Sequence, residues 1–239
     1  ADCINKIVTL GTPHRGISFQ GLRDFGFVDA QDELEEFNPS AQADASNPTS
    51  YVNLPQHFPQ EGILTVVGTN YRTYETRIAT TLNRLFSAPQ ERGWAYNRSD
   101  GLVKQSSAQL PGAPRTFVHK SHGGYDSLVT SREAFEVATR FFHGDVYARL
   151  NLVDAMVKRG LDRFGHSEIF FGVSIKPRRV DFDLFHQSAE AENCYGPFRT
   201  PDLTDDLSRN EGFDWAGPER LVWEGWFDTG RVSPIADQP

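Results

Sequence analysis

The stretch Ile7-Val-Thr-Leu-Gly-Thr-Pro-His-Arg-Gly16 decides the fold class. It continues a β-rich run that begins at Asn5, and its apolar and β-branched residues are typical of a buried strand. The glycine and proline that follow would end this strand. In open parallel α/β sheets, function gathers at the carboxyl ends of the strands. We therefore expect a sheet strand that leads into a functional loop over residues 11–16.

Two further runs predict strands, the apolar Ile63–Val67 and the short Thr116–His119. Residues 72–92 have helical character between them. An amphipathic helix is expected over Ser131–Phe142, with Ser131 as its N-cap. Its predicted apolar stripe consists of Phe135, Val137, Ala138, Phe141 and Phe142. This alternation of strands and helices predicts an α/β fold with a mostly parallel sheet.

The pattern changes at Gly144-Asp145. The following runs alternate or are continuously apolar and predict strands at 146–150, 169–175, 179–185 and 220–227. We therefore expect two domains, an α/β domain over residues 1–145 and a small all-β, sandwich-like domain over residues 146–239.

Residues 17–60 lack a clear period and contain several prolines, with a possible helical turn over 29–37. Long irregular segments in compact domains often form lids or binding loops. The aromatic residues of this segment could line an acyl pocket or could be ordinary core residues; they are Phe19, Phe25, Phe27 and Phe37.

Composition excludes some classes of function. The net charge of −8 argues against nucleic acid as a partner, because phosphate binding needs clustered Lys and Arg. No apolar run reaches the ~18–20 residues of a membrane-spanning helix. The cysteines, Cys3 and Cys194, leave both a disulfide and two unpaired thiols open. The cellular compartment, secretion included, cannot be read from them.

Two more polar clusters lie, like residues 11–16, directly after predicted strands. Ser99-Asp100-Gly101 and Lys120-Ser121-His122-Gly-Gly124 carry a carboxylate and an imidazole 22 residues apart, each at the end of a predicted strand. With Ile7–Gly16, they resemble the lipase and esterase family of serine hydrolases with the α/β-hydrolase fold. The resemblance covers roughly residues 1–145 and matches the chain order of that family's catalytic triad, Ser…Asp…His.

The resemblance implies that His122 is the general acid and base and that Asp100 orients it. A neutral imidazole must take the proton of a serine hydroxyl, and a carboxylate selects its tautomer. His119 competes for the histidine role, but it lies inside a predicted strand. A metal site at His119-x-x-His122 lacks a third ligand at a recognised spacing, so we expect neither a metal nor another cofactor.

The nucleophile is where the sequence departs from the family. No G-x-S-x-G motif occurs, although Ser18, Ser167 and Ser174 each follow a glycine by two residues. We expect the nucleophile elbow and the oxyanion hole upstream of residue 1, so the isolated chain should be inactive.

The sequence thus predicts part of a hydrolase that cleaves carboxylic esters through an acyl-serine intermediate. Its expected partners are an ester or lipid-like small molecule and the N-terminal segment that carries the serine. The alternatives are an acyltransferase or amidase with the same triad, and a non-catalytic binding or interaction module on the α/β-hydrolase scaffold.

Overall fold

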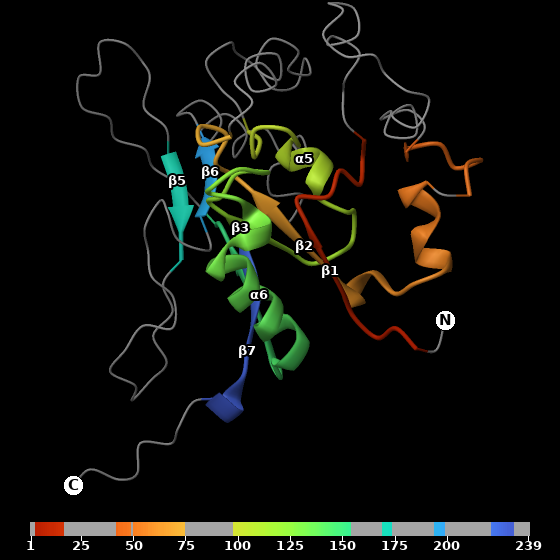
Figure 1. Ribbon diagram of the computed structural model, residues 1–239. Coiled ribbons are helices and arrows are strands. Elements are labelled where there is room, and N and C mark those ends of the chain that lie inside the picture. The colour runs from red at the N-terminus through yellow and green to blue at the C-terminus, as the bar shows by residue number, and fades with distance from the viewer. Residues whose placement is uncertain are drawn as a thin grey trace, which may run out of the picture.

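The computed structural model describes residues 3–16, 42–48, 50–74, 98–153, 169–173, 194–198 and 221–231. Figure 1 shows a small central sheet with helix α6 in front of it and further strands beside it. The chain is a mixed α/β protein with a small parallel sheet and, in the part described, few helices.

The central sheet has three parallel strands in the order β1 (Ile7–Leu10), β2 (Ile63–Gly68) and β3 (Arg115–Val118). Leu10 pairs with Val66, and Gly68 pairs with Val118. Every residue of β2 is buried, because a strand lies on each side of it and other residues cover both faces. The predicted parallel sheet is confirmed, with strand ends shifted by at most two residues.

Helix α6 (Arg132–His143) covers one face of this sheet. It begins as predicted after Ser131, whose hydroxyl oxygen accepts the backbone N–H of Ala134 at 3.1 Å. The buried side of the helix consists of Ala134, Val137 and Phe141. The prediction that Phe135 and Phe142 belong to this side was wrong, since both are exposed. Each lies one residue, or about 100°, further around the helix than a buried position.

The opposite face of the sheet packs against residues that are distant in the sequence. Val67 and Phe117 lie in a buried cluster with Val103 and Tyr195. The rings of Phe117 and Tyr195 stack, with their centroids 3.6 Å apart. Val66 faces the α6 side instead, so successive residues of β2 serve opposite layers, as the two-residue period of a strand requires.

Beyond α6 the described residues form antiparallel pairs, in which β4 (Val146–Asn151) pairs with β7 (Leu221–Phe227) and β5 (Ile169–Gly172) with β6 (Cys194–Phe198). Strand β7 also lies against β3 and α6, and the buried Glu224 carboxylate accepts the backbone N–H of Arg115 at 2.9 Å. The predicted strand at 179–185 falls outside the described residues. A separate sandwich-like domain over 146–239 stays a prediction.

The remaining described chain includes short helical segments; they are η1 (Tyr51–Gln56), η2 (Gln60–Gly62), α5 (Gln105–Ala108), η3 (Leu128–Thr130) and η4 (Thr229–Arg231). Most of the helical stretch expected at 72–92, and the four phenylalanines of the expected lid, lie outside the described residues. None of the helices described here has the length and apolarity needed to cross a membrane. Cys3 is exposed and has a free thiol.

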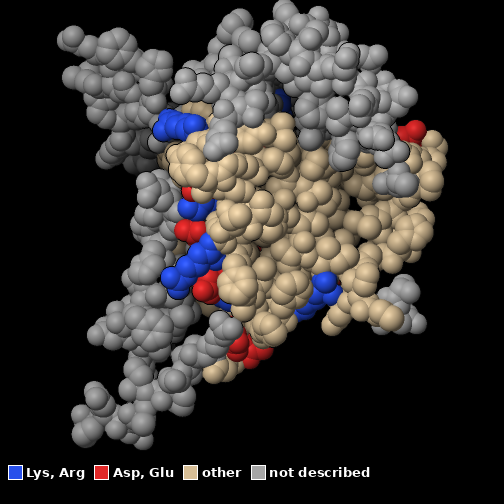
Figure 2. All heavy atoms as spheres, viewed as in Figure 1, with Lys and Arg blue, Asp and Glu red and all other residues tan. Residues whose placement is uncertain are grey.

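Figure 2 shows the charge on one face of the molecule. Its described surface is largely uncharged, and blue Lys and Arg atoms alternate with red Asp and Glu atoms along one side. Ion pairs of α6 show the same mixing of charge, for example Glu136 with Arg132 and with Arg140. Opposite charges are thus interleaved on this described face rather than separated into patches.

Candidate active site

Gly11 brings the first polar cluster against the other two. It follows β1 directly, and its backbone N–H donates to the carbonyl oxygen of Val66 at 2.8 Å. A β-carbon at position 11 would lie 2.9 Å from Asp100 Oδ2 and 3.4 Å from His122 Nδ1, and the φ of Gly11 is +57°. Glycine is favoured here because any side chain would crowd the acid and the histidine. The clusters at 11–16, 99–101 and 119–124 therefore meet at the carboxyl edge of the sheet.

Asp100 lies in a tight turn closed by an antiparallel bridge between Ser99 and Lys104. The strand predicted to end here would lie before residue 98, outside the described residues. Asp100 Oδ1 accepts the backbone N–H groups of Leu102 at 3.1 Å and Val103 at 2.7 Å, and the residue is 1% exposed. These bonds replace the water that a buried carboxylate loses, and they leave Oδ2 available for another donor.

His122 lies on a short loop that is fastened at both ends. The backbone N–H of Ser121 donates to the carbonyl oxygen of Asp126 at 3.0 Å, and that of Leu128 donates to the carbonyl oxygen of Ser121 at 2.7 Å. The backbone N–H of His122 itself donates to the carbonyl oxygen of Asp100 at 2.8 Å. The loop that carries the imidazole is thus attached to the backbone of the acid.

The side chains of Asp100 and His122 form a hydrogen-bonded pair, with Asp100 Oδ2 2.9 Å from His122 Nδ1. This hydrogen bond raises the pKa of His122 above its ordinary value, against the lowering effect of burial. When Nδ1 donates its proton to Asp100, the neutral ring presents Nε2 as a proton acceptor. The His122 side chain is 30% exposed, and Nε2 has no hydrogen-bond partner among the described residues. The pair can therefore accept a proton at Nε2, on a side chain that is part-exposed to solvent.

His119, the rival histidine, points elsewhere. Its Nδ1 lies 3.0 Å from the hydroxyl of Thr69, and its ring meets Phe170 edge to face. Burial lowers the pKa of His119 to about 4, so the ring is neutral at physiological pH. Asp100 is therefore paired with His122 and not with His119. Among the described residues, no three or more His, Cys, Asp or Glu side chains are grouped so that they could hold a metal ion.

His14 belongs to the first cluster but not to the acid–histidine pair. Its Nε2 lies 2.9 Å from the hydroxyl of Thr9 on β1, and burial lowers its pKa to about 4. The neighbouring Arg15 places its guanidinium over the ring of Tyr51, 5.9 Å from the centroid. These two side chains stabilise the loop after β1, while Gly11 is the part of the cluster that contacts the pair.

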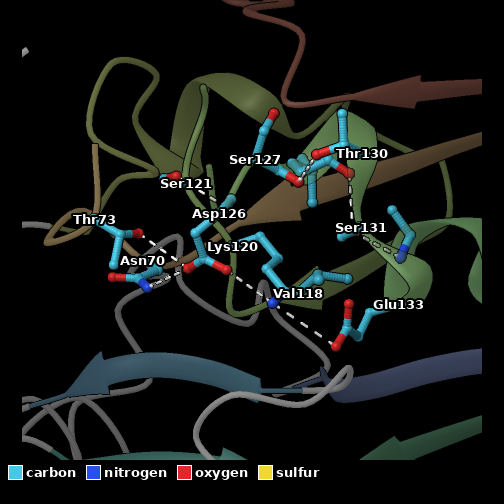
Figure 3. Close-up of polar contacts among 12 residues, drawn as sticks. Asn70, Thr73, Val118, Lys120, Ser121, Asp126, Ser127, Thr130, Ser131 and Glu133 are labelled. Carbon is cyan, nitrogen blue, oxygen red and sulfur yellow. Dashed lines mark hydrogen bonds and ion pairs between the residues drawn. The ribbon is translucent and has the colours of Figure 1, made fainter. Parts of the chain in front are cut away.

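Sequence reasoning missed Tyr74 and Asp126. The Tyr74 ring meets the His122 ring edge to face, with centroids 6.2 Å apart. Asp126 accepts hydrogen bonds from Asn70 and Thr73, which follow β2 (Figure 3). A signal was available for this second group, because polar residues directly after the buried run Ile63–Val67 stand at the functional edge of a sheet.

The described residues do not include a candidate nucleophile at the proper spacing. Ser18, Ser167 and Ser174, the serines that follow a glycine by two residues, all lie outside the described part of the chain. Comparison with known proteins adds no assignment, since no family model, curated protein or solved structure matches the chain. The function has to be argued from the geometry of the site itself.

Proposed function

We propose that this chain supplies the acid and the histidine of a lipase- or esterase-like serine hydrolase with the α/β-hydrolase fold. One observation carries the proposal. A buried carboxylate, Asp100, is hydrogen-bonded to Nδ1 of His122, whose Nε2 is without a described partner and whose side chain is part-exposed. This is the arrangement that activates a serine hydroxyl.

In the proposed reaction, Nε2 of His122 takes the proton of the serine hydroxyl while Oγ forms a bond to the ester carbonyl carbon. Asp100 stabilises the imidazolium and keeps Nδ1 protonated. The imidazolium then gives its proton to the departing alkoxide as the carbon–oxygen bond breaks, which leaves an acyl-serine. Water then attacks the acyl-serine carbonyl, with the same proton transfers through His122. This step releases the carboxylic acid and regenerates the serine.

The proposal places the nucleophile and the oxyanion hole on residues that precede residue 1 in a longer polypeptide. The chain order of the α/β-hydrolase triad supports this placement, since the serine comes before the acid and the histidine.

The surroundings of His122 support an ester with an apolar acyl or alcohol group as substrate. Tyr125 and Val129 follow the histidine in the chain by three and seven residues, and both are well exposed, at 81% and 65%. Exposed apolar side chains that are close to the histidine in the chain favour an apolar substrate.

The decisive experiment compares ester hydrolysis by the longer polypeptide and its variants, with p-nitrophenyl butyrate as the probe. His122→Ala should abolish turnover, and Asp100→Asn should lower kcat by ~10³–10⁴-fold because the histidine loses its orienting carboxylate. His119→Asn serves as the matched control and should retain turnover. Parallel assays with an anilide and with added alcohol acceptors would separate an esterase from an amidase or an acyltransferase.

Two results would overturn the proposal. If the longer polypeptide lacks a serine elbow and His122→Ala changes nothing, the chain is a non-catalytic interaction module. Turnover by the 239-residue chain alone would show that the nucleophile lies within it.

A further inference from the structure

Asp126 occupies the centre of a polar network beside the candidate site (Figure 3). Its Oδ2 accepts hydrogen bonds from Asn70 Nδ2 and from the hydroxyl of Thr73, each at 3.0 Å. Its Oδ1 lies 2.8 Å from Nζ of Lys120 in an ion pair that is largely shielded from solvent. The carboxylate therefore joins the segment after β2 to the segment after β3.

The backbone of Asp126 contacts the histidine loop as well. Its carbonyl oxygen accepts both the backbone N–H and the hydroxyl of Ser121, each at 3.0 Å. Lys120 and Ser121 are the two residues directly before His122. Asp126 thus contacts the start of the histidine loop through its side chain and through its main chain.

The segment after β2, which Asp126 binds through Asn70 and Thr73, also reaches Asp100 and His122. Thr73 precedes Tyr74, whose ring meets His122 edge to face. A β-carbon added at Gly101, next to Asp100, would lie 2.3 Å from Cβ of Tyr74. Tyr74 is therefore wedged between the acid turn and the histidine, and its position depends on the segment that Asp126 binds.

We infer that Asp126 is a positioning residue that sets the distance between His122 and Asp100, an inference that rests on the proposed function for its catalytic consequence. A carboxylate suits this role because it offers two acceptor oxygens, one for each side of the network. An amide of the same shape offers one oxygen and would release one side. Small displacements of this kind are costly in a catalytic pair, of the order of 10²-fold for 1 Å.

The test is the pKa of His122, measured by NMR titration of its ring carbon in the 239-residue chain, with the signal assigned by its loss in His122→Ala. Asp126→Asn should lower this pKa, because a misplaced ring loses part of its hydrogen bond to Asp100. Asp145→Asn is the matched control, since the Asp145 carboxylate also accepts an N–H and a hydroxyl hydrogen bond, here from the backbone and side chain of Thr229, but lies at the junction of α6 and β4. It should leave the pKa of His122 unchanged, and thermal unfolding would show that both variants fold.

Lys120→Met separates positioning from simple charge. Removing the ammonium should lower the pKa of His122 if Lys120 and Asp126 act by holding the loop. It should raise this pKa if the network acts only through its charges, because a nearby cation disfavours imidazolium. Glu133, 3.8 Å from Lys120, is a further charged side chain beside the network and is unchanged in both variants.

A lower pKa of His122 in both Asp126→Asn and Lys120→Met supports the inference. Shifts of opposite sign in the two variants, or no shift in either, overturn it. In the longer polypeptide, Asp126→Asn should reduce kcat by ~10-fold or more with KM within about twofold. If both variants lower the pKa of His122 but the longer polypeptide hydrolyses no ester, positioning stands and the hydrolase proposal fails. If esters are hydrolysed and the pKa of His122 is unchanged in both variants, the hydrolase proposal stands and positioning fails.

Discussion

Gly68, the last residue of β2, lies directly against Asp100. A β-carbon at position 68 would fall 2.5 Å from Cβ of Asp100 and 2.8 Å from the carbonyl oxygen of Lys120. Atoms do not approach so closely without displacement. The end of the central strand is therefore the point where the acid turn and the start of the histidine loop come together, and they can do so because residue 68 has no side chain.

Gly68→Ala should destabilise the protein and disturb the acid–histidine pair. One of its close contacts is a backbone carbonyl, which cannot rotate away as a side chain can. We expect a loss of about 1–3 kcal/mol in the free energy of unfolding, as for other overpacked sites. The pKa of His122 should fall in the same variant, measured by NMR.

Gly123→Ala is the control for this effect. A β-carbon at position 123 would meet Tyr74 Cε2 at 3.4 Å, an ordinary contact distance, although it adjoins His122. Unfolding in urea should place it within ~0.5 kcal/mol of wild type. Equal stability of the two alanine variants would contradict the crowding at Gly68.

Asp100→Asn should remove part of the pH dependence of stability. The hydrogen bond from Asp100 raises the pKa of His122 above 6.5, its value in the unfolded chain. The folded state then binds the proton more tightly, so this contribution is fully present below pH 6.5 and is lost as the pH rises through the folded-state pKa. The stability difference between wild type and Asp100→Asn should therefore shrink from weakly acidic to alkaline pH. A difference that grows with pH would contradict the assignment.

His14 and His119 should produce the opposite dependence. Burial lowers the pKa of each to about 4, so the fold favours their neutral forms. The unfolded chain takes up these protons first, and stability present above pH 6.5 is lost as the pH falls towards 4. His14→Gln and His119→Asn place an amide nitrogen where Nε2 or Nδ1 stood. Together they should flatten the loss of unfolding free energy between pH 7 and pH 5.

The matched control for these histidines is His143→Asn at the exposed end of α6. It should keep the wild-type slope of unfolding free energy against pH. An unchanged slope in the double variant would show that another group causes the acid sensitivity.

Glu224 should link the unfolding of β7 to that of the central sheet. Its carboxylate accepts the backbone N–H of Arg115 at 2.9 Å, pairs with Arg149 at 3.5 Å and accepts the hydroxyl of Tyr147. Glu224→Ala removes a buried carboxylate that joins donors on β3 and β4, and it should cost about 3 kcal/mol in urea unfolding followed by tryptophan fluorescence.

Glu136→Ala, which removes a more exposed carboxylate from α6, should cost under ~1 kcal/mol. A two-domain chain predicts that Glu224→Ala splits one unfolding transition into two. A single shifted transition would favour one cooperative unit and would contradict the predicted division at residue 145.

Much of the described fold could be predicted because its signals are local. The run Ile63–Val67 is apolar except for Thr65, and it became the buried central strand. Ser131 caps α6 because the capping hydrogen bond spans a few residues. The apolar stripe of α6 was overestimated, because hydrophobic character alone does not decide whether Phe135 finds a partner.

The candidate site shows the same limit. Asp100 and His122 could be named from motif and chain order, and so could the expectation that they lie near residues 11–16. The sequence did not single out Asp126, whose partners Asn70 and Thr73 are more than fifty residues away along the chain. Such a contact depends on which strands become neighbours, and short-range patterns do not record it.

By itself the sequence determined the three parallel strands, the capped helix and the positions of one carboxylate and one imidazole in loops. These follow from side-chain periodicity and backbone preference, which act between neighbours in the chain. Only the tertiary structure decided that Asp100 meets His122 rather than His119, and that Gly11, Gly68 and Asp126 hold them in place. The reason is geometric: the order and register of the strands set which loops meet, and burial then allows only close-fitting, hydrogen-bonded arrangements.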